Sequence, residues 1–197
     1  MADTWATKTA MTAGKGYIGS ASIGSDKAYA VGGTPDDTNH LDTNYEYSQA
    51  GDSWLTKTAL PATRAYLACS TIGADKLYAF CGLATQVFSS KSTTTYEYSQ
   101  IGNSWATKTA NPMARFEFLA ATIGNDKAYT HAGRVGTSTI TDANSEYSQA
   151  GNSWTAKAVT IGSAYHNGYN IGNMLYAVAG LNDNRKGNRE YNQASDV

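Results

Sequence analysis

Small and apolar residues alternate with polar ones along this chain in short stretches that recur about every fifty residues. Examples are YIGSASI from Tyr17 and YLACSTI from Tyr66, each followed by a turn related to Ile-Gly-x-Asp-Lys. An apolar stretch such as AYAV or LYAF then ends in glycine. Such short alternation predicts half-buried β-strands, and no segment shows a helical period. We therefore expect an all-β chain.

Two more predicted strands complete each unit, one at the YEYSQ segment and one that begins at a tryptophan and alternates outward to a lysine. A Gly-Asp or Gly-Asn pair before the tryptophan suits a hairpin turn with positive φ. Four short strands per unit are typical of a propeller blade. The tryptophans should pack between neighbouring blades, and the lysines should protect the outer sheet edge. The tryptophans lie 49, 51 and 49 residues apart, at Trp5, Trp54, Trp105 and Trp154.

The unit carries four marks in a constant order. A glycine pair, Gly32-Gly33, precedes the tyrosine of YEY, and a tryptophan and then the Pro-x-x-Arg motif that ends at Arg64 follow. With these marks the chain resembles the kelch-repeat family, whose blades have a period of about fifty residues. Only the first unit keeps both glycines, and Lys15 and Ser163 replace the arginine in the first and last units. The resemblance implies a propeller that binds protein partners.

The repeat predicts one propeller domain of four blades, at about 15–59, 64–110, 115–159, and 163–197 together with 1–10. The last unit stops at REYNQASDV before any tryptophan, whereas the chain begins with MADTWATKTA, which reads as a fourth strand. We expect this N-terminal strand to complete the last blade and close the ring, which removes exposed sheet edges. The same ends would also allow two chains to close an eight-bladed ring.

Composition narrows the range of functions. The 197 residues are enough for one domain and do not require a second. A formal net charge of −1 without a basic run argues against nucleic acid or an anionic membrane as a partner. The N-terminal stretch lacks the pattern of a secretory signal, and no run is long enough to span a membrane. These features lead us to expect a cytoplasmic or virion-associated location.

Side chains that could do chemistry are scattered through the units. Cys69 and Cys81 occupy positions that hold small residues elsewhere, so we expect buried free thiols rather than a disulfide. The histidines fall in a loop, a second strand and a first strand, at His40, His131 and His166. We therefore expect no catalytic residue, no metal site and no cofactor.

Variation between the units marks the expected binding surface. The hairpins with IGxDK and SQxGxS are nearly invariant, whereas the loops of the opposite face differ. These loops begin at Thr34, Leu83, Arg134 and Leu181. Differentiated loops on a rigid scaffold commonly carry specificity. In the first loop the acidic residues are expected to be solvated turn residues rather than calcium ligands, namely Asp36, Asp37 and Asp42.

Cationic and aromatic residues stand beside these loops at the start of the inner strands. They either bind a carboxylate, a sugar or a peptide side chain, or satisfy neighbouring backbone groups and fill the channel. The candidate binding face comprises Lys15, Tyr17, Asp36, Asp37, His40, Arg64, Tyr66, Phe88, Lys91, Arg115, Glu117, Arg134, Tyr165, Arg185 and Lys186.

Taken together, the sequence favours a non-catalytic binding or scaffold protein that presents variable loops to a protein partner, as a monomer or a closed homodimer. A structural appendage or decoration subunit of a virus particle or surface assembly, with receptor or glycan binding, is the alternative. A carbohydrate-active enzyme ranks third, because no residue constellation supports it.

Overall fold

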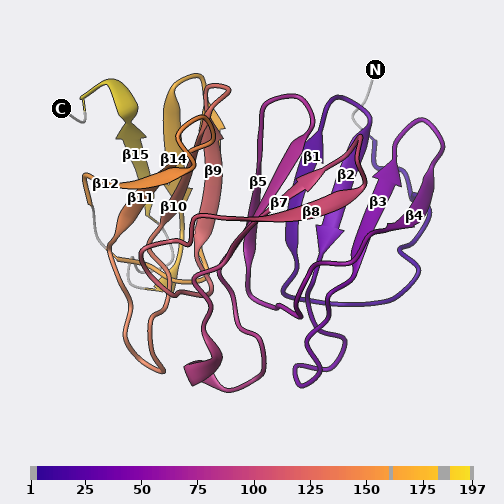
Figure 1. Ribbon diagram of the computed structural model, residues 1–197, viewed down its shortest axis with the longest axis horizontal. Coiled ribbons are helices and arrows are strands. Elements are labelled where there is room, and N and C mark those ends of the chain that lie inside the picture. Colours follow the sequence, from indigo (N-terminus) through magenta and orange to yellow (C-terminus); the bar gives the residue numbers. More distant parts are fainter. Residues whose placement is uncertain (1–3, 160–161, 182–186, 196–197) are drawn as a thin grey trace.

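The computed structural model describes residues 4–159, 162–181 and 187–195. Its strands form four antiparallel sheets that stand as the blades of a β-propeller (Figure 1). The predicted all-β, four-bladed architecture is therefore confirmed. Within the described residues, three blades have four strands and the last blade has three.

Each blade is a meander whose strands pair in sequence order. The first blade contains β1 (Gly19–Ile23), β2 (Lys27–Val31), β3 (Asn44–Ser48) and β4 (Ser53–Lys57). The second contains β5 (Ala68–Ile72), β6 (Lys76–Phe80), β7 (Thr95–Ser99) and β8 (Ser104–Lys108), with the short 3-10 helix η1 (Phe88–Ser90) in its long loop. The third contains β9 (Leu119–Ile123), β10 (Lys127–His131), β11 (Asn144–Ser148) and β12 (Ser153–Lys157). The fourth contains β13 (Asn167–Ile171), β14 (Met174–Val178) and β15 (Asn188–Asn192), followed by η3 (Gln193–Ser195).

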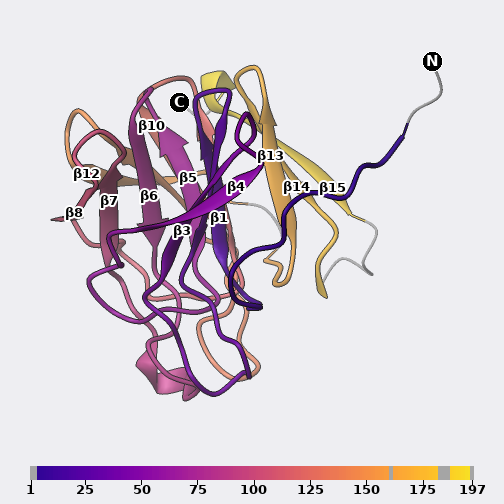
Figure 2. The same ribbon diagram turned by 90° about the vertical axis from the view of Figure 1, so that its right-hand side faces the viewer.

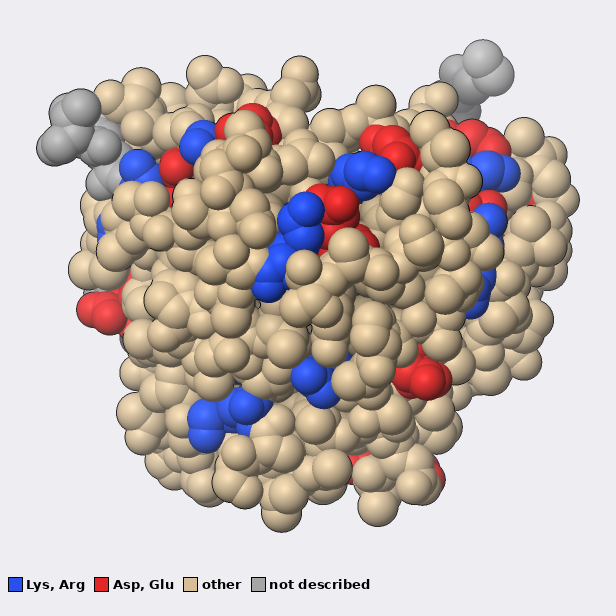
Figure 3. Space-filling model, viewed as in Figure 1, with Lys and Arg blue, Asp and Glu red and all other residues tan. Residues whose placement is uncertain are grey.

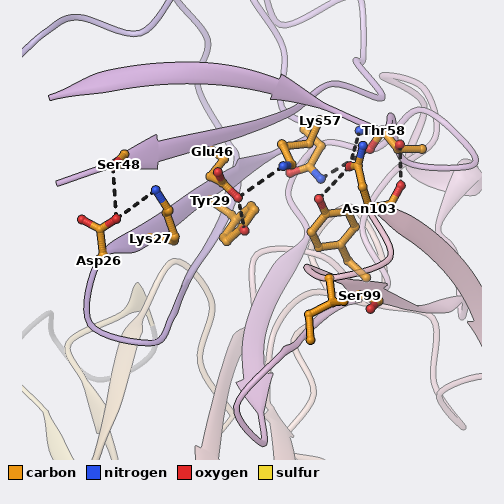
Figure 4. Close-up of polar contacts among 12 residues, drawn as sticks. Asp26, Lys27, Tyr29, Glu46, Ser48, Lys57, Thr58, Ser99 and Asn103 are labelled. Atoms are coloured by element: carbon orange, nitrogen blue, oxygen red, sulfur yellow. Dashed lines mark hydrogen bonds and ion pairs between the residues drawn. The ribbon is translucent and has the colours of Figure 1, made fainter. Parts of the chain in front are cut away.

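The aspartate of the Ile-Gly-x-Asp-Lys turn joins the two hairpins of a blade (Figure 4). In the first blade, the Asp26 carboxylate accepts hydrogen bonds from the Ser48 hydroxyl at 3.1 Å and from the Ala50 backbone N–H at 2.7 Å. Its ion pair with Lys27, at 2.9 Å, and these hydrogen bonds hold the pKa of Asp26 below its usual value. The second and third blades repeat these contacts at Asp75 and Asp126. The invariance of the hairpin face therefore has a structural cause.

A glutamate on the third strand receives contacts from both of its neighbouring strands. Lys57 of β4 lies 3.7 Å from the Glu46 carboxylate, and the Tyr29 hydroxyl donates to the same group (Figure 4). Because Glu46 is buried, its carboxylate requires such partners. The outer-strand lysine, which the sequence analysis assigns to protection of the sheet edge, thus forms an internal ion pair. Equivalent pairs join Lys108 to Glu97 and Lys157 to Glu146.

In the first three blades, the outer strand is bound to the unit before it through a tryptophan. The Trp105 indole N–H donates to the Thr58 carbonyl oxygen at 2.9 Å. In return, Thr58 donates its backbone N–H to the Asn103 side-chain oxygen at 3.0 Å and its hydroxyl to the Asn103 carbonyl oxygen at 2.6 Å. The same junction recurs between Trp154, Asn152 and Thr109, and between Trp54, Asp52 and Thr9. We call this set of contacts the tryptophan junction.

Apolar cores lie between successive blades. Trp105 and Trp154 are partly buried and pack against the first two of these cores, as the sequence predicts. Trp5 differs, because its side chain is fully exposed. Cys69 and Cys81 are buried free thiols, in agreement with the sequence analysis.

The N-terminal segment does not complete the last blade in this single chain. Residues 4–10 form no strand, and Thr9 is bound to the first blade. In Figure 1 the indigo segment that begins the described chain and β15 lie at opposite sides of the molecule, and in Figure 2 this segment extends beyond the sheets. Backbone hydrogen bonds connect the inner strands of successive blades, but in the described part of the chain none connects the first blade to the fourth. The prediction that residues 1–10 close the ring is therefore wrong for this single chain. Thr9 is bound to the first blade, whereas closure requires the segment to pair with β15 of the fourth blade.

Replacing Trp105 with alanine should lower the free energy of unfolding by about 2 to 3 kcal/mol, because the half-buried ring and its hydrogen bond are both lost. Trp105→Phe keeps most of the ring contact and should cost about 1 kcal/mol. Ile101→Ala, at a side chain that is 88% exposed, is the control and should change the value by less than about 0.5 kcal/mol. Urea denaturation measures all three. A Trp105→Ala protein as stable as the control would contradict the role of the junction.

Candidate functional site

Four residues at matching positions surround the mouth of the propeller on its loop face. Tyr17, Tyr66, Glu117 and Tyr165 all have left-handed backbone conformations, with φ values of 52°, 56°, 54° and 57°. A ladder of hydrogen bonds holds them there: each of the last three donates its backbone N–H to the carbonyl oxygen of the one before, at 2.9, 3.2 and 3.2 Å. Left-handed conformations are uncommon for residues other than glycine. Here the ladder maintains them and sets the four side chains around one opening.

Aromatic rings line this mouth. The rings of Tyr17 and Tyr66 are stacked with their centroids 4.1 Å apart, and those of Phe88 and Phe116 are stacked at 5.4 Å. Tyr66 and Phe116 meet edge to face at 6.3 Å, which joins the two stacks. Tyr17 and Tyr165 are about half exposed, at 47% and 52%. The mouth therefore presents aromatic surface to solvent on a packed aromatic base.

Arg134, from the long loop of the third blade, lies across this base. Its guanidinium carbon is 5.6 Å from the ring centroids of both Phe88 and Phe116 and 6.0 Å from that of Tyr165. Its Nη1 also lies 3.5 Å from the Glu117 carboxylate and donates to the Tyr165 hydroxyl at 3.2 Å. Stacking on aromatic faces and pairing with a carboxylate are both characteristic of arginine. We call Tyr17, Tyr66, Phe88, Phe116, Glu117, Arg134 and Tyr165 the mouth cluster.

Burial changes the acidity of two groups in the mouth cluster. The pKa of Glu117 is raised by burial, although Tyr165 and Arg134 act in the opposite direction. Its side chain is only 5% exposed, compared with 17% for Arg134. Burial also raises the pKa of Tyr66 to about 12, so its hydroxyl stays protonated at neutral pH. The cluster thus holds one ion pair beneath neutral aromatic groups.

The cations at the start of the inner strands serve the backbone rather than the mouth. Arg115 is fully buried and donates to the carbonyl oxygens of Ala132 at 3.2 Å and Ala143 at 2.9 Å. Arg64 is also buried and donates to the Thr63 carbonyl oxygen at 2.7 Å. Lys15 donates in the same way to carbonyl and hydroxyl oxygens of the first blade, and burial lowers its pKa to about 8. Of the two interpretations left open by the sequence, the structure supports backbone satisfaction for these three residues.

The acidic loop of the first blade has a structural role. The Asp36 carboxylate accepts backbone N–H groups from Thr38 at 3.0 Å and Asn39 at 2.8 Å, and this bonding lowers its pKa. Asp37 is exposed and has a φ of 61°. These residues shape a turn, which is the interpretation that the sequence favours.

The other candidates from the sequence divide into two groups. His40 is buried, with its Nδ1 3.0 Å from the Leu83 carbonyl oxygen and its ring edge-on to Tyr66 at 6.2 Å. Lys91 donates to the Phe88 carbonyl oxygen at 2.8 Å and so supports the loop that holds that ring. Both residues position the mouth cluster from outside it. Arg185 and Lys186 lie outside the described residues.

Phe116 is the member of the mouth cluster that the sequence analysis missed. It is fully buried and contacts Tyr66, Phe88 and Arg134. The corresponding residues of the other units are small, namely Gly16, Ala65 and Ala164. A phenylalanine at a position that holds a small residue in every other unit is the sequence signal that could have identified Phe116.

A second group of buried titratable side chains lies between the third and fourth blades. His131 and His166 are buried with ring centroids 5.6 Å apart. Burial lowers the pKa of His131 to about 3 and that of His166 to about 4. Among the described residues, no three His, Cys, Asp or Glu side chains lie together so as to hold a metal ion. Burial also raises the pKa of Cys81 to about 12, which makes it a poor nucleophile.

Comparisons with known proteins bear on the fold. No protein-family model matches the chain, and no curated protein matches it by sequence. Among solved structures, the chain is similar to YjhT, with a TM-score of 0.77 and 15% sequence identity, over 90% of this chain and 62% of that one. The chain thus spans less than two thirds of that structure, and the likeness supports the propeller fold. None of the helices in the described residues is long and apolar enough to cross a membrane.

Acid should destabilise the protein through the two histidines. In the unfolded chain they titrate near pH 6.5, but in the folded chain their pKa values are about 3 and about 4. The unfolded state therefore binds more protons, so stability is complete above about pH 6.5 and falls as the pH decreases toward 4, by up to about 1.4 kcal/mol per pH unit for each histidine. His131→Phe, which copies Phe80 of the second blade, should remove about half of this dependence in urea denaturation. An unchanged pH profile would contradict the account.

Arg134→Met should raise the pKa of Glu117 further, because the positive charge that opposes the effect of burial is removed. Arg134→Lys keeps the charge and is the matched control. Carbon NMR titration of the side-chain carboxyl measures both. In the wild type, the folded state binds the extra proton, so stability should fall as the pH rises from the usual glutamate pKa through the raised one. A Glu117 pKa that is unchanged or lower in Arg134→Met would refute the proposed ion pair.

Proposed function

We propose that the protein is a non-catalytic binding module whose loop face engages a protein partner through the mouth cluster. The observation that carries the proposal is the half-exposed pair of tyrosines, Tyr17 and Tyr165, on either side of the ion pair between the partly exposed Arg134 and the buried Glu117 carboxylate. Propeller folds place their variable loops on one face, and this face gathers contributions from every blade.

The chemistry of the mouth cluster resembles the centre of a protein interface. Tyrosine and arginine are enriched among the residues that contribute most to binding energy. Tyr17 is stacked on Tyr66 before any partner arrives, so little side-chain freedom remains to be lost on binding. The pairing of Arg134 with Glu117 balances the charge at this point. A partner would thus meet a preorganised aromatic surface with one partly exposed guanidinium.

The titratable groups near the mouth are already engaged, which supports a role without catalysis. His40 is buried beneath the loops, Glu117 is paired with Arg134, and the Tyr66 hydroxyl has a pKa of about 12. General acid–base work calls for a group whose pKa lies near the working pH and which reaches a substrate. On the side of the molecule that Figure 3 shows, acidic and basic residues are interspersed.

A role as a subunit of a larger assembly is the second candidate. One observation favours it, the fully exposed Trp5 in an N-terminal segment whose sequence is that of an outer strand. An assembly subunit would use this end of the arc in addition to the loop face.

Tyr17→Asn combined with Tyr165→Asn should weaken partner binding at least tenfold, because asparagine tolerates the left-handed backbone but removes both rings. The partner is first isolated by capture on the wild-type protein, and its affinity for each variant is then measured by calorimetry. Ile101→Asn, on the opposite face, is the matched control and should bind as wild type does. Equal affinity for all three proteins, or equal loss in the control, would refute the proposal. A captured glycan would replace the protein partner with a carbohydrate ligand.

A further inference from the structure

A cavity of about 220 Å³ lies between the third and fourth blades. His131, Asn144 and Val159 line it from the third blade, and Leu175, Glu190 and Tyr191 line it from the fourth. Its lining combines apolar side chains with polar and charged ones. Cavities of this kind between packed blades are destabilising unless something fills them.

In the other junctions, a tryptophan occupies the corresponding place. Trp154 packs on Phe80 of the preceding blade, with centroids 5.5 Å apart, and on Tyr147 of its own blade at 5.1 Å. Its indole N–H donates to the Thr109 carbonyl oxygen. By the repeat, His131 corresponds to Phe80, Tyr191 to Tyr147 and Ala158 to Thr109, and these three residues all line the cavity. The cavity is therefore the tryptophan position of a fourth outer strand.

The fourth blade also carries a glutamate, Glu190, at the position that pairs with the outer-strand lysine in the other blades. Glu46, Glu97 and Glu146 each accept a tyrosine hydroxyl and pair with the lysine of the fourth strand. Glu190 accepts the Tyr176 hydroxyl at 2.7 Å in the same way. Within the described residues, no lysine forms an ion pair with Glu190, which lines the cavity. A strand that brings both a tryptophan and a lysine at the repeat spacing would complete the pattern.

The N-terminal segment has this sequence. Residues 4–8 read TWATK, which matches the SWATK of β8 at every position but the first. The ring of Trp5 is fully exposed. Thr9 is already bound to the first blade as Thr58 is bound to the second, through Asp52 and Trp54. The segment is thus placed where the outer strand of a preceding blade would lie, and in this chain β15 is at the other side of the molecule (Figure 1).

We propose that residues 4–8 of one chain add to β15 of a second copy as its fourth strand, and that the second copy does the same in return. Trp5 fills the cavity of the partner copy, and Lys8 pairs with its Glu190. Addition of a strand to an exposed sheet edge satisfies the backbone groups of that edge. Because each copy supplies one strand and accepts one, two copies close the assembly. The product is a ring of eight blades, which lies within the range of known propellers.

Sedimentation equilibrium of the full chain tests the assembly directly. The wild type should have twice the mass of the 20.9 kDa chain, and Trp5→Ala should shift it to a monomer. Leu55→Ala, at an exposed apolar residue of β4, is the control and should remain dimeric. A wild type that stays monomeric at 100 μM, or a Trp5→Ala variant that stays fully dimeric, would overturn the proposal.

Charge exchange distinguishes a second copy from closure within one chain. Lys8→Glu and Glu190→Lys each place like charges at both junctions of a homodimer, so each should weaken dimerisation by about tenfold. Mixing the two variants restores opposite charges at both junctions only if the strands are exchanged between chains, so the mixture should form a heterodimer with affinity near that of the wild type. The double variant in one chain should dimerise as well. If the mixture does not regain the wild-type affinity and the double variant is a stable monomer, the strand closes within one chain, and the proposal is overturned.

Discussion

The tryptophan junction is the interaction on which the arrangement of the blades depends. The indoles of Trp54, Trp105 and Trp154 each donate their N–H to a carbonyl oxygen of the preceding unit, and the residue that carries this carbonyl donates its backbone N–H to an Asn or Asp side-chain oxygen. This pair of bonds connects the end of one outer strand to the outer strand of the next blade. The three junctions in the described part of the chain join the N-terminal segment and the first three blades in order. In the proposed assembly, the number of blades in the ring is set by what occupies the junction at the fourth blade.

The two faces of the propeller differ in how much their sequence can vary. On the hairpin face, Asp26 and its repeats join both hairpins of a blade through side-chain hydrogen bonds, so substitution there would separate them. On the loop face, the left-handed ladder is made by backbone groups alone. The side chains on that ladder are consequently free to differ, and one unit carries Glu117 where the others carry tyrosine. The loop face can therefore carry side chains that differ from blade to blade without loss of the backbone ladder.

Much of the fold could be predicted from the sequence, because strands and blades follow from a period that local residues encode. The buried thiols followed from comparing units, and the turn role of Asp36 followed from the lack of a calcium-ligand pattern in its loop. The mouth cluster was only partly predictable, since Phe116 and Arg134 meet through packing between blades that no local pattern shows. The role of Arg115 required the positions of the carbonyl groups around it. The predicted ring closure was wrong because Thr9 is bound to the first blade, a contact between units that no local pattern shows.

Hydrogen exchange of the four indole N–H groups, followed by nitrogen-15 NMR of the full chain, tests the tryptophan junction most directly. The account predicts slow exchange for Trp54, Trp105 and Trp154 at every concentration, because their hydrogen bonds lie within one chain. It predicts slow exchange for Trp5 only at concentrations where two copies associate. Rapid exchange at the first three positions, or protection of Trp5 that does not depend on concentration, would contradict the account.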